Sequence, residues 1–421
     1  MLLRKTPLLI AAITICIYTM SLSIVQAQNG NQDALAGFHP YRDGKPQVAG
    51  ITPGMTINKD NVQIAEKVLP PEVLRVIQAG DFDITVQETS DFPLFEPYIQ
   101  ASVEHAGTAQ LGADGQVTGY IAGQPFPIID SSDPQAGLRA AWNFRYRYLG
   151  DTVQTQGMLR SINSSGNVER GVDTYYSRRY GMHRLDAKDN VPKWEKEGTW
   201  YREHSIVLSP QDLEGAQRLS LHYADDTANQ KGWVYDPQSR RTRSVVVNLH
   251  ETSFGLNFLV EDHSGFNGYV RDHTWEFIGE EVVLVPGLIE GTPPEYGDKN
   301  GWYPQAPWEL RKVVIIDATP KDSGHPYGKR RFYFDRQIYS ILLAFVYDEQ
   351  GKHWRTLFHS FGRPEFDPDN KDAQGAPLHL GNSWVDYKSD SAAVWSADEF
   401  LVNKPLKPKQ FTVKEMVRRG K

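Results

Sequence analysis

Apolar and polar residues alternate along most of the chain after its first quarter. Three long runs show this pattern around a glycine-bearing turn, namely 109–123, 157–176 and 336–361. Such a turn between two alternating runs is typical of an antiparallel β-hairpin. Further strand-like runs lie at 205–208, 218–223, 243–248, 276–285 and 310–316. Because little helical pattern separates these runs, we predict a mainly β fold built on one large, curved antiparallel sheet with a few short helices.

The stretch 132–151 carries two patterns at once. Leu138 and Trp142 have helical spacing, and a Pro near the start of the stretch suits a first helical turn. Trp142, Phe144 and Tyr146, in contrast, alternate with polar residues in the manner of a strand. We therefore predict a short helix that turns into a strand near Trp142.

The first residues have the pattern of a secretory leader. Arg4 and Lys5 precede an apolar run over residues 7–25, and the sequence Val-Gln-Ala ends at Ala27. This order of charge, apolar run and small residues predicts a signal peptide over residues 1–27, cleaved after Ala27, and hence a periplasmic protein. An uncleaved membrane anchor is the alternative, because the apolar run is about as long as a short spanning helix.

The remainder divides into two parts. Residues 28–57 are rich in Gly, Gln, Asp and Pro and lack periodicity, so we expect an irregular N-terminal segment. Residues 58–421 are expected to form a single domain that begins with short helices at 61–67 and 71–78. The one cysteine, Cys16, lies in the leader, so we expect the mature protein to contain neither a disulfide nor a thiolate nucleophile.

Charge and motifs exclude several function classes. The formal net charge is −7, and loss of Arg4 and Lys5 with the leader makes it more negative, so nucleic acid is not an expected partner. The sequence contains no G-x-S-x-G elbow, H-E-x-x-H zinc helix, phosphate loop or dinucleotide fingerprint. No catalytic residue and no cofactor are therefore predicted, although dispersed carboxylates leave no such pattern.

Two residue pairs are candidates for metal binding, namely Asp262-His263 and Asp272-His273. Adjacent residues on a strand point to opposite faces, so each pair offers one ligand at most. We interpret these residues as surface residues and predict no metal site.

Aromatic alternation gives the first candidate binding residues. A sheet that curls without closing needs large side chains on its concave face, either as core or as the lining of a cavity for an apolar ligand. Both interpretations stay open for the alternating residues Trp142, Phe144 and Tyr146, and for Trp233 and Tyr235, which share one face of their strand.

Two arginines complete the candidate set. Arg241 and Arg243 share one face of a strand, where they could bind a phosphate or carboxylate at a cavity mouth. The alternative is that they protect an exposed strand edge against pairing. The predicted ligand-binding residues are thus Trp142, Phe144, Tyr146, Trp233, Tyr235, Arg241 and Arg243.

Several stretches together resemble a known family. They are 123–151, 231–245, 258–286, 307–318, 325–355 and 411–421. In this order they resemble the family known as domain of unknown function thirteen twenty-nine, which is labelled as outer-membrane lipoprotein-sorting-like and is related to the LolA and LolB carriers. The resemblance implies an open, curved half-barrel whose mouth is covered by short helices. In those carriers the pattern W-x-Y-x-P followed by paired arginines belongs to the barrel wall, and it is matched here by Trp233, Tyr235, Pro237, Arg240 and Arg241.

The leading functional hypothesis is a periplasmic carrier or chaperone for a lipid or another hydrophobic molecule. The resemblance adds an accessory role beside a membrane transporter or an outer-membrane protein. One alternative is an envelope hydrolase that uses carboxylates such as Glu276, Glu280 and Glu281. Another is a structural partner of an outer-membrane complex that binds through exposed loops.

Overall fold

A computed structural model describes residues 34–185, 190–373 and 375–420. The predicted signal peptide 1–27, Cys16 and the first residues of the segment 28–57 lie outside these ranges. Within the described ranges, no helix is both long and apolar enough to cross a membrane.

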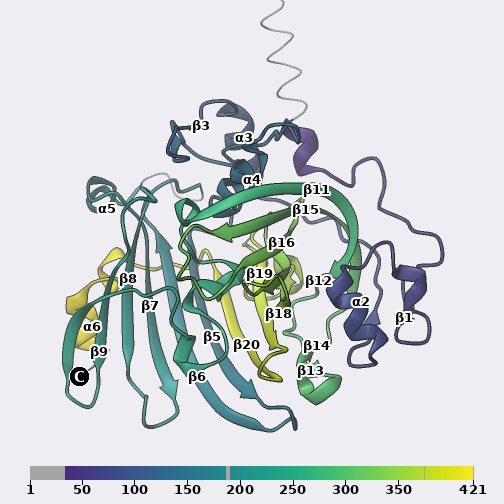
Figure 1. Ribbon diagram of the computed structural model, residues 1–421. Helices are drawn as coiled ribbons and strands as arrows, with labels where there is room; N and C mark the ends of the chain where they lie inside the picture. The colour runs from purple at the N-terminus through teal and green to yellow at the C-terminus, as the bar shows by residue number, and fades with distance from the viewer. Residues whose placement is uncertain (1–33, 186–189, 374, 421) are drawn as a thin grey trace, which may run out of the picture.

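One sheet of 14 strands dominates the described part of the chain (Figure 1). Its strands are β5 (Thr152–Ile162), β6 (Val168–Tyr180), β7 (Thr199–Ser209), β8 (Gln217–Tyr223), β9 (Lys231–Asp236), β10 (Arg241–Val246), β11 (His273–Pro286), β12 (Leu288–Ile289), β15 (Trp308–Pro320), β16 (Lys329–Asp335), β17 (Ile341–Tyr347), β18 (His353–Gly362), β19 (Leu378–Asp386) and β20 (Ser391–Val402).

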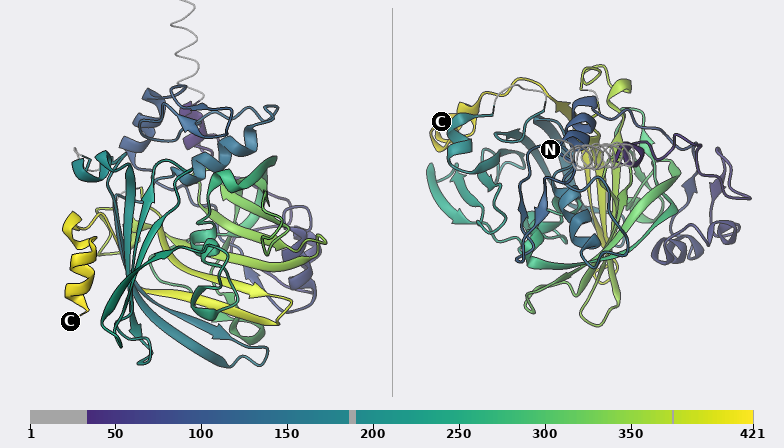
Figure 2. Two further views of the ribbon diagram at one scale, coloured as in Figure 1. Left: turned by 60° about the vertical axis from the view of Figure 1, so that its left-hand side comes forward. Right: turned by 90° about the horizontal axis from the view of Figure 1, so that it is seen from above.

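The strand order joins two meanders. It runs β10-β9-β8-β7-β6-β5-β20-β19-β18-β17-β16-β15-β11, and each neighbouring pair is antiparallel, while β12 pairs in parallel with β18. The pairing of β5 with β20 joins the two halves. Strands β10 and β11 end the order without pairing to each other, so the sheet curls but stays open (Figure 2). The prediction of a mainly β fold with one large antiparallel sheet is confirmed.

The other elements are short. The helices are α2 (Pro71–Gln78), α3 (Glu96–Glu104), α4 (Ala136–Arg145), α5 (Pro192–Lys196) and α6 (Val413–Arg419), and the short 3-10 turns are η1 (Val62–Ala65), η2 (Ser253–Gly255), η3 (Val260–Gly265), η4 (Val270–Asp272), η5 (Lys299–Gly301), η6 (Pro364–Phe366) and η7 (Pro408–Gln410). Small ribbons pair β1 (Thr56–Ile57) with β2 (Ile84–Thr85), β3 (Gln110–Leu111) with β4 (Val117–Thr118), and β13 (Tyr296–Gly297) with β14 (Tyr303–Pro304).

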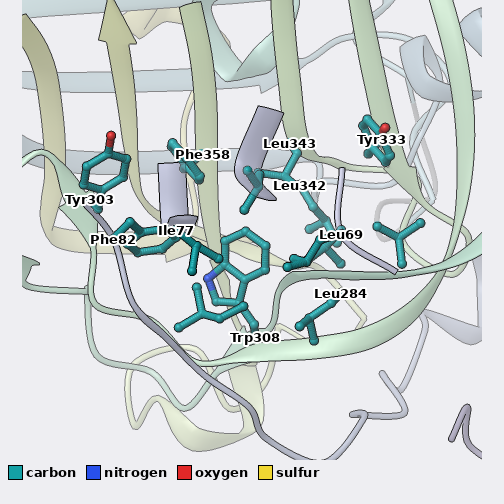
Figure 3. Packing of buried hydrophobic residues seen from close by; sticks show 14 of the residues in the cluster. Leu69, Ile77, Phe82, Leu284, Tyr303, Trp308, Tyr333, Leu342, Leu343 and Phe358 are labelled. Carbon is teal, nitrogen blue, oxygen red and sulfur yellow. The ribbon is translucent and has the colours of Figure 1, made fainter. Parts of the chain in front are cut away.

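The two faces of the sheet are covered by different parts of the chain. We call the face that packs against residues 247–272 the inner face, and the opposite face the outer face. On the outer face, η1, α2 and the residues after them cover β15 to β19 (Figure 3). Phe82 stacks on Tyr303 at 4.7 Å between ring centroids and also contacts Trp308 and Phe358. This packing makes the outer face of that half a closed hydrophobic core.

The strand predicted near Trp142 is wrong, because α4 continues through Arg145. The helix lies directly on β11, where a Cβ at Gly137 would come within 2.6 Å of the Trp275 carbonyl oxygen. Ala140 and Ala141 are also buried, so small residues permit this close approach. Tertiary packing of the small face therefore overrides the alternation of the aromatic residues.

Candidate functional site

The chain between β10 and β11, residues 247–272, crosses the inner face, and we call it the inner segment. It contains only the short turns η2, η3 and η4. Phe258 stacks on Trp384 of β19 at 4.0 Å, and Asn257 Nδ2 donates to Ser391 Oγ at 2.8 Å. Long stretches without regular structure are uncommon inside a compact domain and are usually functional. The inner segment is therefore the first component of the candidate site.

A buried ionic network fixes the second half of the inner segment. Arg330 Nη2 of β16 donates to Glu261 Oε2 at 2.5 Å, and His325 Nε2 is hydrogen-bonded to the same oxygen at 2.9 Å. Tyr327 Oη donates to Asp262 Oδ2 at 2.6 Å. Burial would raise the pKa of Glu261, but Arg330 and the neighbouring histidines lower it below its ordinary value. Breaking such a network leaves a buried charge unpaired, so this half of the segment is firmly anchored.

Three groups of this network have metal-ligand chemistry. The ligand atoms of His250, Glu261 and His325 lie within 4.8 Å of one another. The Arg330 guanidinium already shares the Glu261 oxygen that faces His325, so a cation there would meet a fixed positive charge. The interpretation of Asp262 and His273 as surface residues is wrong, because both are buried in this network. Asp272 is exposed and His263 is half-buried.

The inner face of β6 to β8 carries partly exposed aromatic and charged side chains. Tyr201 lies opposite Tyr180 in the ladder between β6 and β7, and Glu203 lies opposite Arg178. Glu203 pairs with His222 Nε2 at 3.0 Å and accepts a hydrogen bond from Tyr176 Oη at 2.9 Å. Burial would raise the pKa of Glu203, but His222 and its other partners bring it down to about 2. Glu203 is therefore an ionised carboxylate at neutral pH.

Arg147, just after α4, faces the same region. Its guanidinium lies 3.7 Å from the centre of the Phe144 ring, and its Nη1 donates to the Phe144 carbonyl at 2.6 Å. The Nε atom is shielded from solvent and has no hydrogen-bond partner. Burial, together with repulsion from Arg178, lowers the pKa of Arg147 to about 9. The surroundings of Arg147 therefore disfavour its charged form.

Two small cavities adjoin this region. One of about 30 Å³ is lined by residues that include Tyr146, Arg147, Tyr180 and Trp200. The other, of about 10 Å³, is lined by residues that include Tyr98 and Tyr148. Each has room for only one or a few water molecules. In this conformation a ligand of lipid size does not fit into either cavity.

The structure separates the predicted ligand-binding residues into three groups. Trp142, Phe144 and Tyr146 lie together at the end of α4 within the inner aromatic cluster. Trp233 and Tyr235 point to the outer face, beneath α6.

Tyr235 has a defined structural partner on that outer face. It is buried, and its hydroxyl donates to the Gly420 carbonyl at 2.6 Å. Arg241 and Arg243 lie exposed on the edge strand β10 and, by register, share the inner face with Asp236 and Val234.

Two features of the site were missed from the sequence, namely Arg147 with Arg178, and the inner segment. The run Tyr-Tyr-Ser-Arg-Arg-Tyr at 175–180 does carry a signal, because its alternation puts Tyr176, Arg178 and Tyr180 on one face. The carboxylates considered for a hydrolase, Glu276, Glu280 and Glu281, lie exposed along the edge strand β11.

Comparisons with known proteins found a matching family and a relative of similar sequence. A family model described as protein of unknown function, DUF1329, matches residues 56–416. The Uncharacterized protein PA3922 of Pseudomonas aeruginosa is 25% identical over 328 residues, which cover 73% of this chain and 69% of that protein.

Two crystal structures give more distant matches. A Vibrio parahaemolyticus domain named for outer membrane lipoprotein sorting is 15% identical, with a TM-score of 0.48, over 68% of this chain and 100% of that chain. A DUF1329 family protein from Desulfovibrio piger is 16% identical, with a TM-score of 0.47, over 68% of this chain and 100% of that chain.

Proposed function

The chain belongs to the DUF1329 family, and we propose that it is a periplasmic carrier or chaperone that binds a lipid or another hydrophobic molecule on its inner face. The observation that carries the proposal is the inner segment, an irregular stretch that covers an apolar sheet surface which a ligand could otherwise occupy. The leader-like pattern of residues 1–27 supports the periplasmic location.

The first half of the inner segment is the part suited to movement. Its contacts with the sheet include one aromatic stack, Phe258 on Trp384, and one neutral hydrogen bond, Asn257 to Ser391. Phe254 has a φ of 51°, a left-handed conformation that is unfavourable for a bulky side chain, and it is 38% exposed. Such strain often marks a segment with a second conformation. The anchored pair Glu261 and Asp262 would stay in place as the hinge.

Ligand binding would exchange one set of apolar contacts for another. Each methylene that a ligand buries contributes about 0.8 kcal/mol, so an acyl chain gains enough to replace the Phe258 stack and the Asn257 hydrogen bond. The closed conformation keeps the apolar surface covered until a ligand arrives. A membrane transporter or an outer-membrane protein is the proposed partner for loading or unloading.

The test is to tether the first half of the inner segment. Asn257→Cys with Ser391→Cys puts two thiols at a contact point, in a mature chain expected to hold no other cysteine. A bis-maleimide with a reducible spacer then joins them, and uptake of the fluorescent fatty acid cis-parinaric acid is measured. We expect uptake before tethering, loss after tethering and recovery after reduction.

A matched control separates tethering from chemical modification. Lys45→Cys with Glu88→Cys joins two surface segments that form an exposed ion pair at 2.6 Å, and this tether should leave uptake unchanged. Absence of uptake in the untethered protein would refute the carrier function. Persistent uptake after complete tethering would refute displacement of the inner segment.

A further inference from the structure

The inner face of β6 to β10 has a charge opposite to that of the whole chain. By register, Arg178 lies opposite Glu203, Arg218 opposite Ser205 and Arg243 opposite Val234. We call the arginines that share this face the basic face; they are Arg170, Arg178, Arg218, Arg241 and Arg243. Glu203 and Asp236 are the carboxylates on the same face of these strands. The chain as a whole has a formal net charge of −7, so this local excess of positive charge is not a reflection of composition.

Protection of a strand edge does not explain the basic face. That explanation suits Arg241 and Arg243, which lie on the edge strand β10. Arg178 on β6 and Arg218 on β8 lie within the sheet, where both neighbouring strands are already paired. These two arginines instead flank Glu203, whose single negative charge does not balance both of them.

At the end of the basic face away from the edge strand β10, Arg178 lies near Arg147. The guanidinium of Arg178 lies 5.1 Å from the centre of the Tyr180 ring and 5.8 Å from that of the Tyr201 ring. The same two tyrosines raise the pKa of Arg147. The Nε atoms of both arginines are buried without a partner.

Arg145, on the same helix end, also has a buried Nε without a partner, but it differs from Arg147 in having a carboxylate partner. It forms an ion pair with buried Asp226 at 3.0 Å, whereas none of the ion pairs in the described ranges includes Arg147. A buried guanidinium without a carboxylate partner destabilises the folded state, unless another anion binds to it.

We propose that Arg147 and Arg178 receive the anionic headgroup of the bound amphiphile, and that Arg218, Arg241 and Arg243 line its path from the open edge of the sheet. This inference rests on the proposed carrier function and narrows its ligand to a molecule with a phosphate or carboxylate group beside its apolar chain. Guanidinium groups suit both anions, because their planar N–H donors match two oxygens at once. The half-buried rings of Tyr180 and Tyr201 lie beside the guanidinium of Arg178, where the apolar chain would begin.

The experiment compares probes that carry the anionic group, the apolar chain or both parts of this ligand. Isothermal titration calorimetry measures binding of myristoyl-lysophosphatidylglycerol, of myristoyl-lysophosphatidylcholine and of inorganic phosphate, below the micelle concentrations. The first two differ in net charge and share their acyl chain, while phosphate has the anion without the chain. We expect the anionic lysolipid to bind at least roughly tenfold more tightly than the zwitterionic one, as charge-assisted hydrogen bonds permit.

Variants assign this selectivity to the arginines. Arg147→Gln with Arg178→Gln should reduce the affinity for the anionic lysolipid to about that for the zwitterionic one, and should change the latter much less, because its choline group already neutralises the phosphate charge. The control is Arg160→Gln, which removes an arginine with an equally unpaired Nε from the outer face of β5, and it should not alter selectivity. Circular dichroism and thermal unfolding establish that each variant is folded.

The outcomes separate this inference from the carrier function. Equal affinity of the wild-type protein for both lysolipids, or selectivity that survives in the double variant, would overturn the headgroup assignment and leave the carrier intact. Binding of neither lysolipid would refute the carrier and the headgroup assignment together. Phosphate that binds as tightly as the anionic lysolipid would show a site for a free anion, and would overturn the assignment to an amphiphile.

Discussion

At the scale of single residues, two arginines at the end of α4 have opposite surroundings. Arg145 pairs with Asp226, whose side chain is fully buried, while none of the ion pairs among the described residues includes Arg147. Proteins commonly give up stability to keep a group that serves binding. Under the headgroup proposal, this contrast distinguishes a structural arginine from one retained for a ligand.

Replacement of each arginine by methionine tests this contrast. Arg147→Met should raise the free energy of unfolding by about 1 kcal/mol, because a shielded guanidinium is exchanged for an apolar chain. Arg145→Met should lower it by about 3 kcal/mol, because Asp226 loses its partner. Urea unfolding of the ligand-free proteins measures both values. A loss of stability in Arg147→Met as large as in Arg145→Met would mean that Arg147 is structural.

At the scale of elements, the C-terminal helix α6 decides the role of β9. It covers the outer face of β8 and β9 (Figure 2). Tyr235 contacts the end of this helix through a hydrogen bond to the Gly420 carbonyl. Thr412 caps its first turn by accepting a hydrogen bond from the Glu415 amide. The hairpin aromatic residues thus have a packing role that is independent of the inner face.

Tyr235→Ala tests whether this packing is the whole role of the residue. Loss of a buried aromatic ring should lower the free energy of unfolding by about 3–5 kcal/mol. Uptake of cis-parinaric acid per folded molecule should stay unchanged, because the ring lies on the far side of the sheet from the inner segment. Calorimetric unfolding and fluorescence titration of the same sample measure both effects. Reduced uptake by fully folded protein would show that the ring contacts the ligand after all.

The register of β9 explains how far the sequence could predict these elements. Alternation correctly puts Trp233 and Tyr235 on one face, but a period of two does not say which face is the inner one. That choice is made by α6, which is distant in the sequence, and by the inner segment, which has no period of its own.

The site shows the same limit. The alternation in 175–180 contains enough information to put Tyr176, Arg178 and Tyr180 on one face, where the ladder has them, although this shared face was missed from the sequence. It could not be predicted that Arg147 has no carboxylate partner, because this depends on which side chains the fold brings close to Arg147. The helix over Trp142 and Phe144 was hidden for a similar reason, since the close approach of Gly137 to β11 is a tertiary contact.

At the scale of the whole molecule, buried histidines make stability depend on pH. His204 and His273 are both buried, and burial lowers the pKa of His204 to about 4 and that of His273 to about 3. In the unfolded chain the ordinary pKa is near 6.5. Between these values the unfolded state binds more protons, so stability must fall as the pH drops below about 6.5.

Acidification should therefore destabilise the protein well before its carboxylates titrate. Each of these two histidines is expected to cost about 2 kcal/mol at pH 5 relative to pH 7. Urea unfolding at both pH values measures the loss, and His204→Gln should make it smaller. Equal stability at pH 7 and pH 5 would contradict the neutral, buried state of these side chains.

The central claim is that the inner face binds an amphiphile when the inner segment moves aside. It is tested most directly by native mass spectrometry of the protein purified without detergent from its own envelope, with identification of the released ligand after organic extraction. We predict a stoichiometric ligand that has an acyl or similarly apolar chain and an anionic headgroup. Ligand-free protein from the native envelope, together with no uptake of any lysolipid offered in excess, would contradict the claim.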